Sequence, residues 1–157
     1  MLKRILSDTC YDTLPCVSDC LDLEHIAVVE ISSENSEYPI EAALPADQSQ
    51  GWRAGEPGKQ TIRLLFEHPQ PIRSIQLMFS EPSIVRTQEY IVRTSSDNGH
   101  SFLEIVRQQW NFHPHGGEME LEQHIINLPA VNIIEITINP DINNASIYAS
   151  LEKLRLF

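Results

Sequence analysis

A hairpin signal near the middle of the chain constrains the fold more than any other feature. Residues 90–95 show the two-residue side-chain alternation of a β-strand, and residues 102–106 form a second apolar-rich run. Asp97-Asn98-Gly99 lies between them. Asn-Gly is typical of β-hairpin turns because both residues tolerate a positive φ. We therefore expect two antiparallel strands joined by a type I′ turn, in the middle of an antiparallel sheet.

Further strand patterns follow at short intervals along the chain. Apolar side chains recur at every second position within residues 62–66, 75–79 and 134–138, and three more strands are expected over residues 23–32, 119–128 and 148–157. Residues 40–44 predict a single helical turn, and residues 45–58 and 108–117 predict long loops. Regularly spaced short strands indicate an all-β fold, an antiparallel β-sandwich or jelly roll of about eight strands.

Length and charge limit the domain organisation and the partners. The 157 residues suit one domain, which we place at residues 23–157 after an irregular segment over residues 1–22. The formal net charge of −11 repels nucleic-acid phosphates and anionic membranes, so we expect neither as a partner. The apolar stretch at the N-terminus is too short for a signal peptide and Asp8 interrupts it, which predicts a cytoplasmic protein.

The cysteines and the absence of catalytic motifs limit the kinds of chemistry that we expect of this chain. Cys10, Cys16 and Cys20 are odd in number, and their spacing is not a standard zinc pattern, so we expect free thiols. The sequence contains no nucleophile elbow, no phosphate-binding P-loop, no HExxH zinc motif and no dinucleotide fingerprint. We therefore expect a non-catalytic protein.

Several short motifs occur in an order that is familiar from one protein family. In chain order they are Tyr38-Pro39, Glu-Ala-Ala-Leu at residues 41–44, Trp52, Ser-Ser-Asp-Asn-Gly-His-Ser-Phe at residues 95–102 and Ser-Leu-Glu-Lys-Leu-Arg-Leu at residues 150–156. This order resembles the discoidin, or coagulation factor 5/8 type C, family over roughly residues 23–157. The resemblance implies a galactose-binding-like jelly roll, a fold that is used mainly for binding.

The resemblance also implies a calcium ion in the turn before Trp52. Asp47 and Glu152 lie at plausible ligand positions, but Pro45 stands where an acidic oxygen ligand would be expected. Calcium takes about six to eight oxygen ligands, so the loss of one weakens the site. We expect no other cofactor.

The candidate ligand-binding residues come from loops. Arg53 can donate to sugar hydroxyls or to a carboxylate, whereas its neighbour Trp52 is expected to fill the core, as in the family. Residues 108–117 present Trp110, Asn111 and His113, which suit a shallow recognition surface on a rigid β-scaffold.

Two further groups complete the candidate residues. Arg86 belongs to the loop before the hairpin, together with Glu81 and Ser83, and the family commonly places such loops on its ligand face. His113 and His115 with Glu118 could ligate a transition metal, although two histidines in a loop are more often simply exposed.

Two functions from different classes fit these observations. The first is a carbohydrate-binding module that stacks an aromatic ring on a sugar and binds its hydroxyls through Arg53, Arg86, Trp110, Asn111 and His113. The second is an intracellular protein-interaction or scaffolding domain on the same fold. The aromatic loop favours the first, and the missing signal peptide favours the second.

Overall fold

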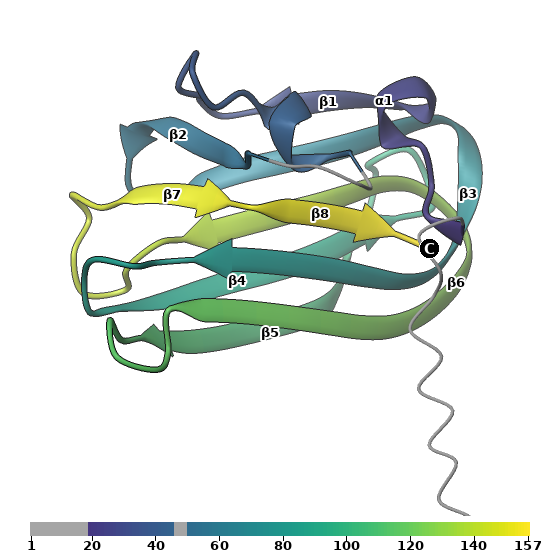
Figure 1. Ribbon diagram of the computed structural model, residues 1–157. Helices are drawn as coiled ribbons and strands as arrows, with labels where there is room; N and C mark the ends of the chain where they lie inside the picture. Colours follow the sequence, from purple (N-terminus) through teal and green to yellow (C-terminus); the bar gives the residue numbers. More distant parts are fainter. Residues whose placement is uncertain (1–18, 46–49) are drawn as a thin grey trace, which may run out of the picture.

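Two strands of 21 residues each contribute to both layers of the β-sandwich. These strands are β3 (Gln60–Ser80) and β6 (Met119–Asn139) in a computed structural model that describes residues 19–45 and 50–157 (Figure 1). Their antiparallel ladder runs from Gln60 paired with Ile138 to Ser80 paired with Met119. The ladder is irregular between Leu65 and Ser74, where both strands bend from one layer of the sandwich into the other.

The shorter strands complete the two layers. One sheet has the order β1-β3-β6-β4-β5, with β8 on the second half of β3, and β2 pairs with β7. The remaining elements are α1 (Leu23–Ile26), β1 (Ala27–Ile31), η2 (Ile40–Ala43), β2 (Trp52–Pro57), β4 (Arg86–Ser95), β5 (Leu103–Phe112), β7 (Tyr148–Leu151) and β8 (Lys153–Leu156). The predicted all-β antiparallel sandwich is thus confirmed. None of the described helices is long and apolar enough to cross a membrane.

Several predicted boundaries were wrong. The two strands predicted from the alternation within residues 62–66 and 75–79 are halves of β3, which passes Pro69 and Pro71 at the bend. Proline is tolerated there because its missing N–H falls where the ladder is already irregular. The loop expected over residues 108–117 is shorter, since β5 continues to Phe112.

The predicted hairpin exists, but with a wider loop and in another place. Asn98 and Gly99 have the expected positive φ values of 57° and 88°. The β4–β5 ladder ends at Thr94 paired with Leu103, so the loop is longer than a two-residue type I′ turn. Hydrogen bonds from Ser101 and Ser95 to the Asp97 carboxylate stabilise this loop and lower the pKa of that carboxyl to about 2. β5 lies at the edge of the sheet rather than in its middle.

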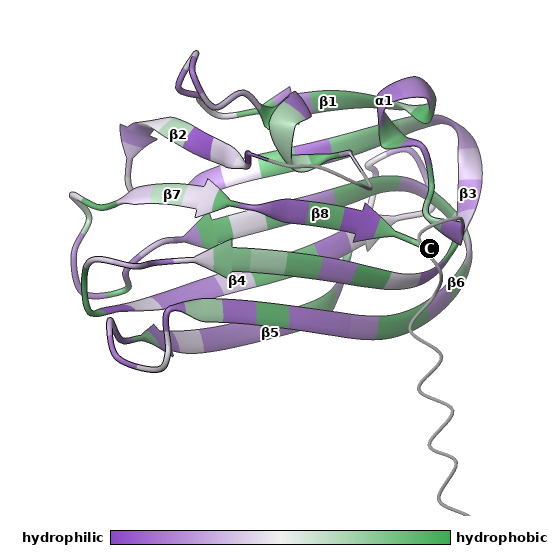
Figure 2. Cartoon of the chain, in the orientation of Figure 1, coloured by the Kyte–Doolittle hydropathy of each residue, from purple (hydrophilic) through white to green (hydrophobic). Residues whose placement is uncertain are grey.

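The core follows the alternation of apolar side chains along the strands, which Figure 2 shows as a change of hydropathy from one residue to the next. Trp52 is fully buried, which confirms its predicted core role, and its Nε1 donates to the Ser33 carbonyl at 3.2 Å. The fully buried residues include Ile62, Leu64, Ile75, Leu77, Phe79, Ile134, Ile136 and Ile138.

A row of alternating charges crosses the outer face of the larger sheet. Cross-strand register aligns Glu30, Arg63, Glu135, Arg93 and Glu104, one from each of five neighbouring strands. Glu135 accepts hydrogen bonds from Nε of Arg63 at 2.7 Å and Nε of Arg93 at 2.8 Å. Burial alone would raise the pKa of Glu135, but these two hydrogen bonds outweigh burial and hold the pKa below its usual value.

Replacement of Glu135 by glutamine should lower the free energy of unfolding by about 1 kcal/mol, because both arginines lose a charged acceptor but remain partly solvated. Chemical denaturation at pH 7 measures this loss. Glu104→Gln, at the exposed end of the same row, is the control and should change stability less. Equal effects of the two substitutions would contradict the central role of Glu135.

Candidate functional site

Three connections meet at one end of the sandwich, at the left of Figure 1. They are the β3–β4, β5–β6 and β6–β7 connections, and we call this end the loop end. The backbone N–H of Glu81 donates to the Glu118 carbonyl at 2.7 Å, and that of Ile142 donates to the Thr87 carbonyl at 2.9 Å. The first bond joins the β3–β4 and β5–β6 connections, and the second ties the β6–β7 connection to β4, so the loops are held on a firm scaffold.

A cavity of about 290 Å³ opens at the loop end, close to the lower limit for small-molecule sites. We call it the apical pocket. Its lining comes from β2, the end of β3 with the following loop, and the β7 region: Arg53, Ser80, Glu81, Pro82, Ser83, Tyr148, Ala149, Ser150 and Glu152. Polar side chains from separate segments therefore converge beside one aromatic ring.

Glu81 is the most firmly held polar group in the apical pocket. Its Oε1 accepts from Nε of Arg86 at 2.8 Å, and its Oε2 accepts from the backbone N–H of Ser83 at 3.1 Å. Each carboxylate oxygen has two lone-pair sites, so Glu81 can still accept a hydrogen bond from a ligand. The carboxylate is fixed before any ligand arrives.

Arg86 supports Glu81 from behind, which corrects its expected role as a direct ligand contact. Its side chain is only 1% exposed, and its guanidinium lies 4.4 Å from the centre of the Phe112 ring. Besides Glu81, its Nη1 donates to the Pro140 carbonyl at 2.7 Å and to Oε1 of Gln88 at 3.2 Å. A ligand in the pocket cannot reach it.

On the other side of the pocket, β2 and β7 bring two of the predicted residues together. Arg53 pairs with Ser150 in the ladder, and its guanidinium lies 4.1 Å from the centre of the Tyr38 ring. Glu152 follows β7, and burial raises its pKa although Arg53 and Lys153 act against this rise. The pocket thus joins Arg53, predicted as a sugar contact, and Glu152, predicted as a calcium ligand.

The other three predicted contacts lie at the loop end but outside the pocket lining. Trp110 is half-buried against the core, with its Nε1 donating to the Gly117 carbonyl at 3.3 Å. Asn111 is exposed on the opposite face of β5, where its Oδ1 accepts from the Thr87 hydroxyl at 2.7 Å. His113 is exposed and begins a turn that two backbone hydrogen bonds with Gly117 close.

The metal predictions find limited support. Across residues 19–45 and 50–157, no three or more His, Cys, Asp or Glu side chains gather closely enough to hold a metal ion, so His113, His115 and Glu118 form no such site. Asp47 lies outside the described residues. Glu152, the other expected calcium ligand, lines the apical pocket with Glu81 and Arg53, and the calcium site that it would share with Asp47 stays a prediction.

Two features of the site were missed at the level of sequence. Tyr148, which is 55% exposed, presents the aromatic ring of the pocket, and Ser150 follows it two positions later on β7. Both were taken as ordinary members of the last strand.

A chain of polar side chains continues inward from Arg86. Nε2 of Gln88 donates to Oε1 of Glu120 at 3.2 Å, and both side chains are fully buried. The second carboxylate oxygen of Glu120 is buried without a hydrogen-bond partner among the described residues. Burial, with help from the charge of Glu122, raises the pKa of Glu120 to about 7.

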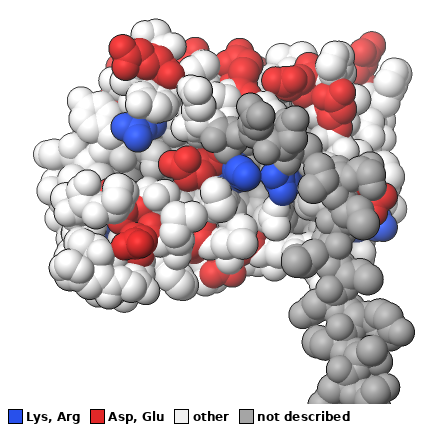
Figure 3. Space-filling view, viewed as in Figure 1, with Lys and Arg blue, Asp and Glu red and all other residues white. Residues whose placement is uncertain are grey.

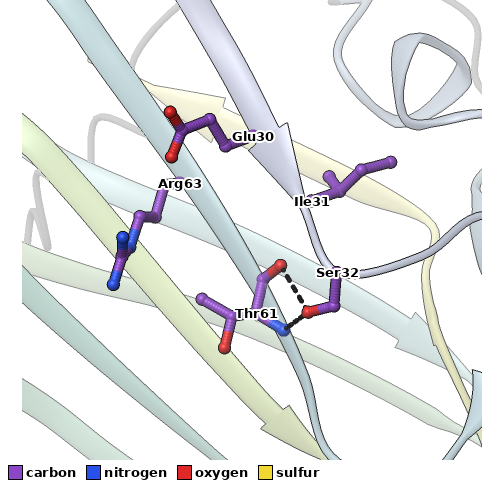
Figure 4. A pocket seen from close by; sticks show the side chains of 5 residues that line it. All are labelled: Glu30, Ile31, Ser32, Thr61 and Arg63. Carbon is purple, nitrogen blue, oxygen red and sulfur yellow. Dashed lines mark hydrogen bonds between the residues drawn. The ribbon is translucent and has the colours of Figure 1, made fainter.

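Two other hollows are weaker candidates for a ligand site. A shallow one of about 240 Å³ lies between β1 and β3, lined by Glu30, Ile31, Ser32, Thr61 and Arg63 (Figure 4). Two of its polar side chains already have partners: Ser32 Oγ exchanges hydrogen bonds with the Thr61 backbone, and Arg63 binds Glu135. The second is a groove of about 440 Å³ between α1, β1 and η2, which six apolar side chains and three glutamates line.

Cys20 is a free thiol, as expected, and its burial raises its pKa. Cys10 and Cys16 lie outside the described residues. Cys20 does not line the apical pocket, whose lining offers hydrogen-bonding groups and one exposed aromatic ring.

The chain belongs to the F5/8 type C domain family, which it matches over residues 28–152. The family resemblance inferred from the motif order is therefore confirmed. No curated protein sequence matches the chain significantly.

Solved structures of family 32 carbohydrate-binding modules (CBMs) share the fold. The family 32 CBM from C. perfringens NanJ, in complex with galactose, is 13% identical with a TM-score of 0.64, over 87% of this chain and 96% of that one. CBM32-3 from a family 31 glycoside hydrolase of Clostridium perfringens is 16% identical with a TM-score of 0.66, over 91% and 97%. The CBM32 of AlyQ, in complex with 4,5-unsaturated mannuronic acid, is 19% identical with a TM-score of 0.59, over 84% and 95%.

Proposed function

We propose that this chain is a non-catalytic carbohydrate-binding module that holds one sugar residue in the apical pocket. The observation that carries the proposal is the fixed Glu81 carboxylate, which lines one cavity with Arg53 and the exposed ring of Tyr148. A carboxylate accepts from hydroxyls, a guanidinium donates to them, and an aromatic ring offers an apolar face to the C–H side of a sugar. Galactose bound to the NanJ module of the same fold adds support.

A longer saccharide would extend from the pocket toward the β5–β6 turn. That turn carries His113 and is joined to the pocket by the hydrogen bond between the Glu81 N–H and the Glu118 carbonyl. Trp110 and Asn111 lie at the end of the strand that leads into it. We retain these three residues as proposed contacts for a second sugar.

A glycan array followed by titration calorimetry tests this function. Tyr148→Ala should weaken binding of an array hit about tenfold, equal to about 1.4 kcal/mol, because the ring is lost while the polar groups stay. Leu103→Ala is the matched control, since Leu103 is similarly exposed at the opposite end of the sandwich. Its affinity should equal that of the wild type.

Two outcomes would contradict the proposal. If Tyr148→Ala and Leu103→Ala bind the sugar equally well, the site lies elsewhere. If no glycan binds, and a protein partner is captured in a manner that depends on Trp110 and His113, the chain is an interaction domain instead.

A further inference from the structure

The apical pocket contains more negative charge than positive charge. Two carboxylates line it, Glu81 and Glu152, whereas Arg53 is its one basic residue. The second arginine nearby, Arg86, is buried and already donates to Glu81, Gln88 and Pro140. The charged side chains that a ligand meets are therefore mostly carboxylates.

The two carboxylates approach the pocket from different segments of the chain. Glu81 is fixed by Arg86 and by the Ser83 backbone. Glu152 lies against Gly51, where a Cβ atom would come within 2.9 Å of its Oε2, so the missing side chain of Gly51 leaves room for the carboxylate. Gly51 also has a φ of 79°, a conformation that favours glycine.

Arg53 is only partly available to balance these charges. Its guanidinium is stacked on Tyr38, which does not line the pocket, and its charge already acts on Glu152. The chain as a whole has a net charge of −11, and the side of the molecule that Figure 3 shows carries more acidic than basic side chains. The surrounding field thus repels anions as they approach.

We propose, on the basis of the carbohydrate-binding function above, that the apical pocket selects sugars by charge: amino sugars bind most tightly, neutral sugars less tightly and uronic acids weakest. An ammonium or hydroxyl group donates to Glu81 and Glu152, whereas a sugar carboxylate would face two like charges and a single guanidinium, that of Arg53. This order of affinities would differ from the ligand of the AlyQ module of the same fold, which was solved with 4,5-unsaturated mannuronic acid.

Calorimetric titration of the full chain with methyl galactoside, galactosamine and galacturonic acid tests this order of affinities. A glycan array that carries neutral, amino and uronic-acid glycans complements the titration. We expect galacturonic acid to bind at least tenfold more weakly than galactosamine at low salt, with the difference shrinking at high salt. Glu152→Gln should reduce the difference. Glu81→Gln should act in the same direction, and circular dichroism establishes that both variants are folded.

The outcomes distinguish the inference from the function on which it rests. If acidic glycans bind as well as amino glycans, or if their binding depends mainly on Arg53, the charge selection is overturned while carbohydrate binding stands. If the Glu152→Gln and Glu81→Gln variants are folded and leave the order of sugar affinities unchanged, the two carboxylates do not cause the selection. If no glycan of any class binds, the proposed function itself fails.

Discussion

Replacement of Arg86 by methionine is expected to lower the free energy of unfolding by about 3 kcal/mol. The guanidinium is buried and donates to three acceptors, which are the carboxylate of Glu81, the amide of Gln88 and the carbonyl of Pro140. Methionine keeps much of the volume beside Phe112 but removes one donor from each of these acceptors. Chemical denaturation followed by tryptophan fluorescence measures the loss.

Arg107→Met is the matched control for Arg86→Met. Arg107 is also an arginine in a strand, and it pairs with Glu89 and Glu104, but its side chain is 53% exposed. Its removal should change stability little because water replaces both partners. If the two variants lose equal stability, the buried network around Arg86 does not contribute as described.

The same substitution separates positioning from direct contact. Without Arg86, the Glu81 carboxylate is held only by the Ser83 backbone, so a folded Arg86→Met protein should bind its sugar about tenfold more weakly. The conservative variant Arg86→Lys should recover part of that affinity by restoring the charge. Unchanged affinity in Arg86→Met would show that Glu81 does not need its buried partner.

Replacement of Glu120 by glutamine is expected to stabilise the protein at pH 8 by about 2 kcal/mol and to leave it nearly unchanged at pH 5. In the folded state the pKa of Glu120 is raised from 4.5 to about 7, so between these values the folded chain binds a proton that the unfolded chain has released. Stability therefore falls as the pH rises through this window. Glutamine cannot ionise and removes that fall.

Unfolding by urea at pH 5 and at pH 8 checks this expectation. Glu118→Gln, an exposed carboxylate on the turn just before Glu120, is the control and should respond equally at both values. If Glu120→Gln changes stability by the same amount at pH 5 and pH 8, Glu120 does not titrate in this range and its buried oxygen must have a partner such as water.

The fold could be predicted where a strand has one buried face. The isoleucines at 134, 136 and 138 alternate with residues that face outward, and all three are fully buried. The extent of the strands could not be predicted in the same way. Pro69 and Pro71 suggested a break, yet the bend of β3 places them where the ladder is irregular, and that bend depends on the pairing with distant β6.

The candidate site was predictable only in part, for a similar reason. Arg53 and Glu152 were proposed for different ligands, and only the pairing of β2 with β7 brings them into one pocket. Arg86 was expected to be exposed, because nothing near it in sequence indicates that Pro140 and Phe112 would enclose it. Tyr148 was missed because an exposed tyrosine and a core tyrosine look alike in a strand pattern.

The long β3–β6 ladder has a consequence for how the chain reaches its native state. Its first pair joins Gln60 to Ile138 and its last joins Ser80 to Met119, so every contact in it requires the closure of a long segment. The β4–β5 hairpin can form early from local contacts, but by itself it joins only two neighbouring strands of one sheet. Since folding slows as contacts become less local, we expect folding on a scale of about milliseconds to seconds, with β3–β6 pairing as the limiting step.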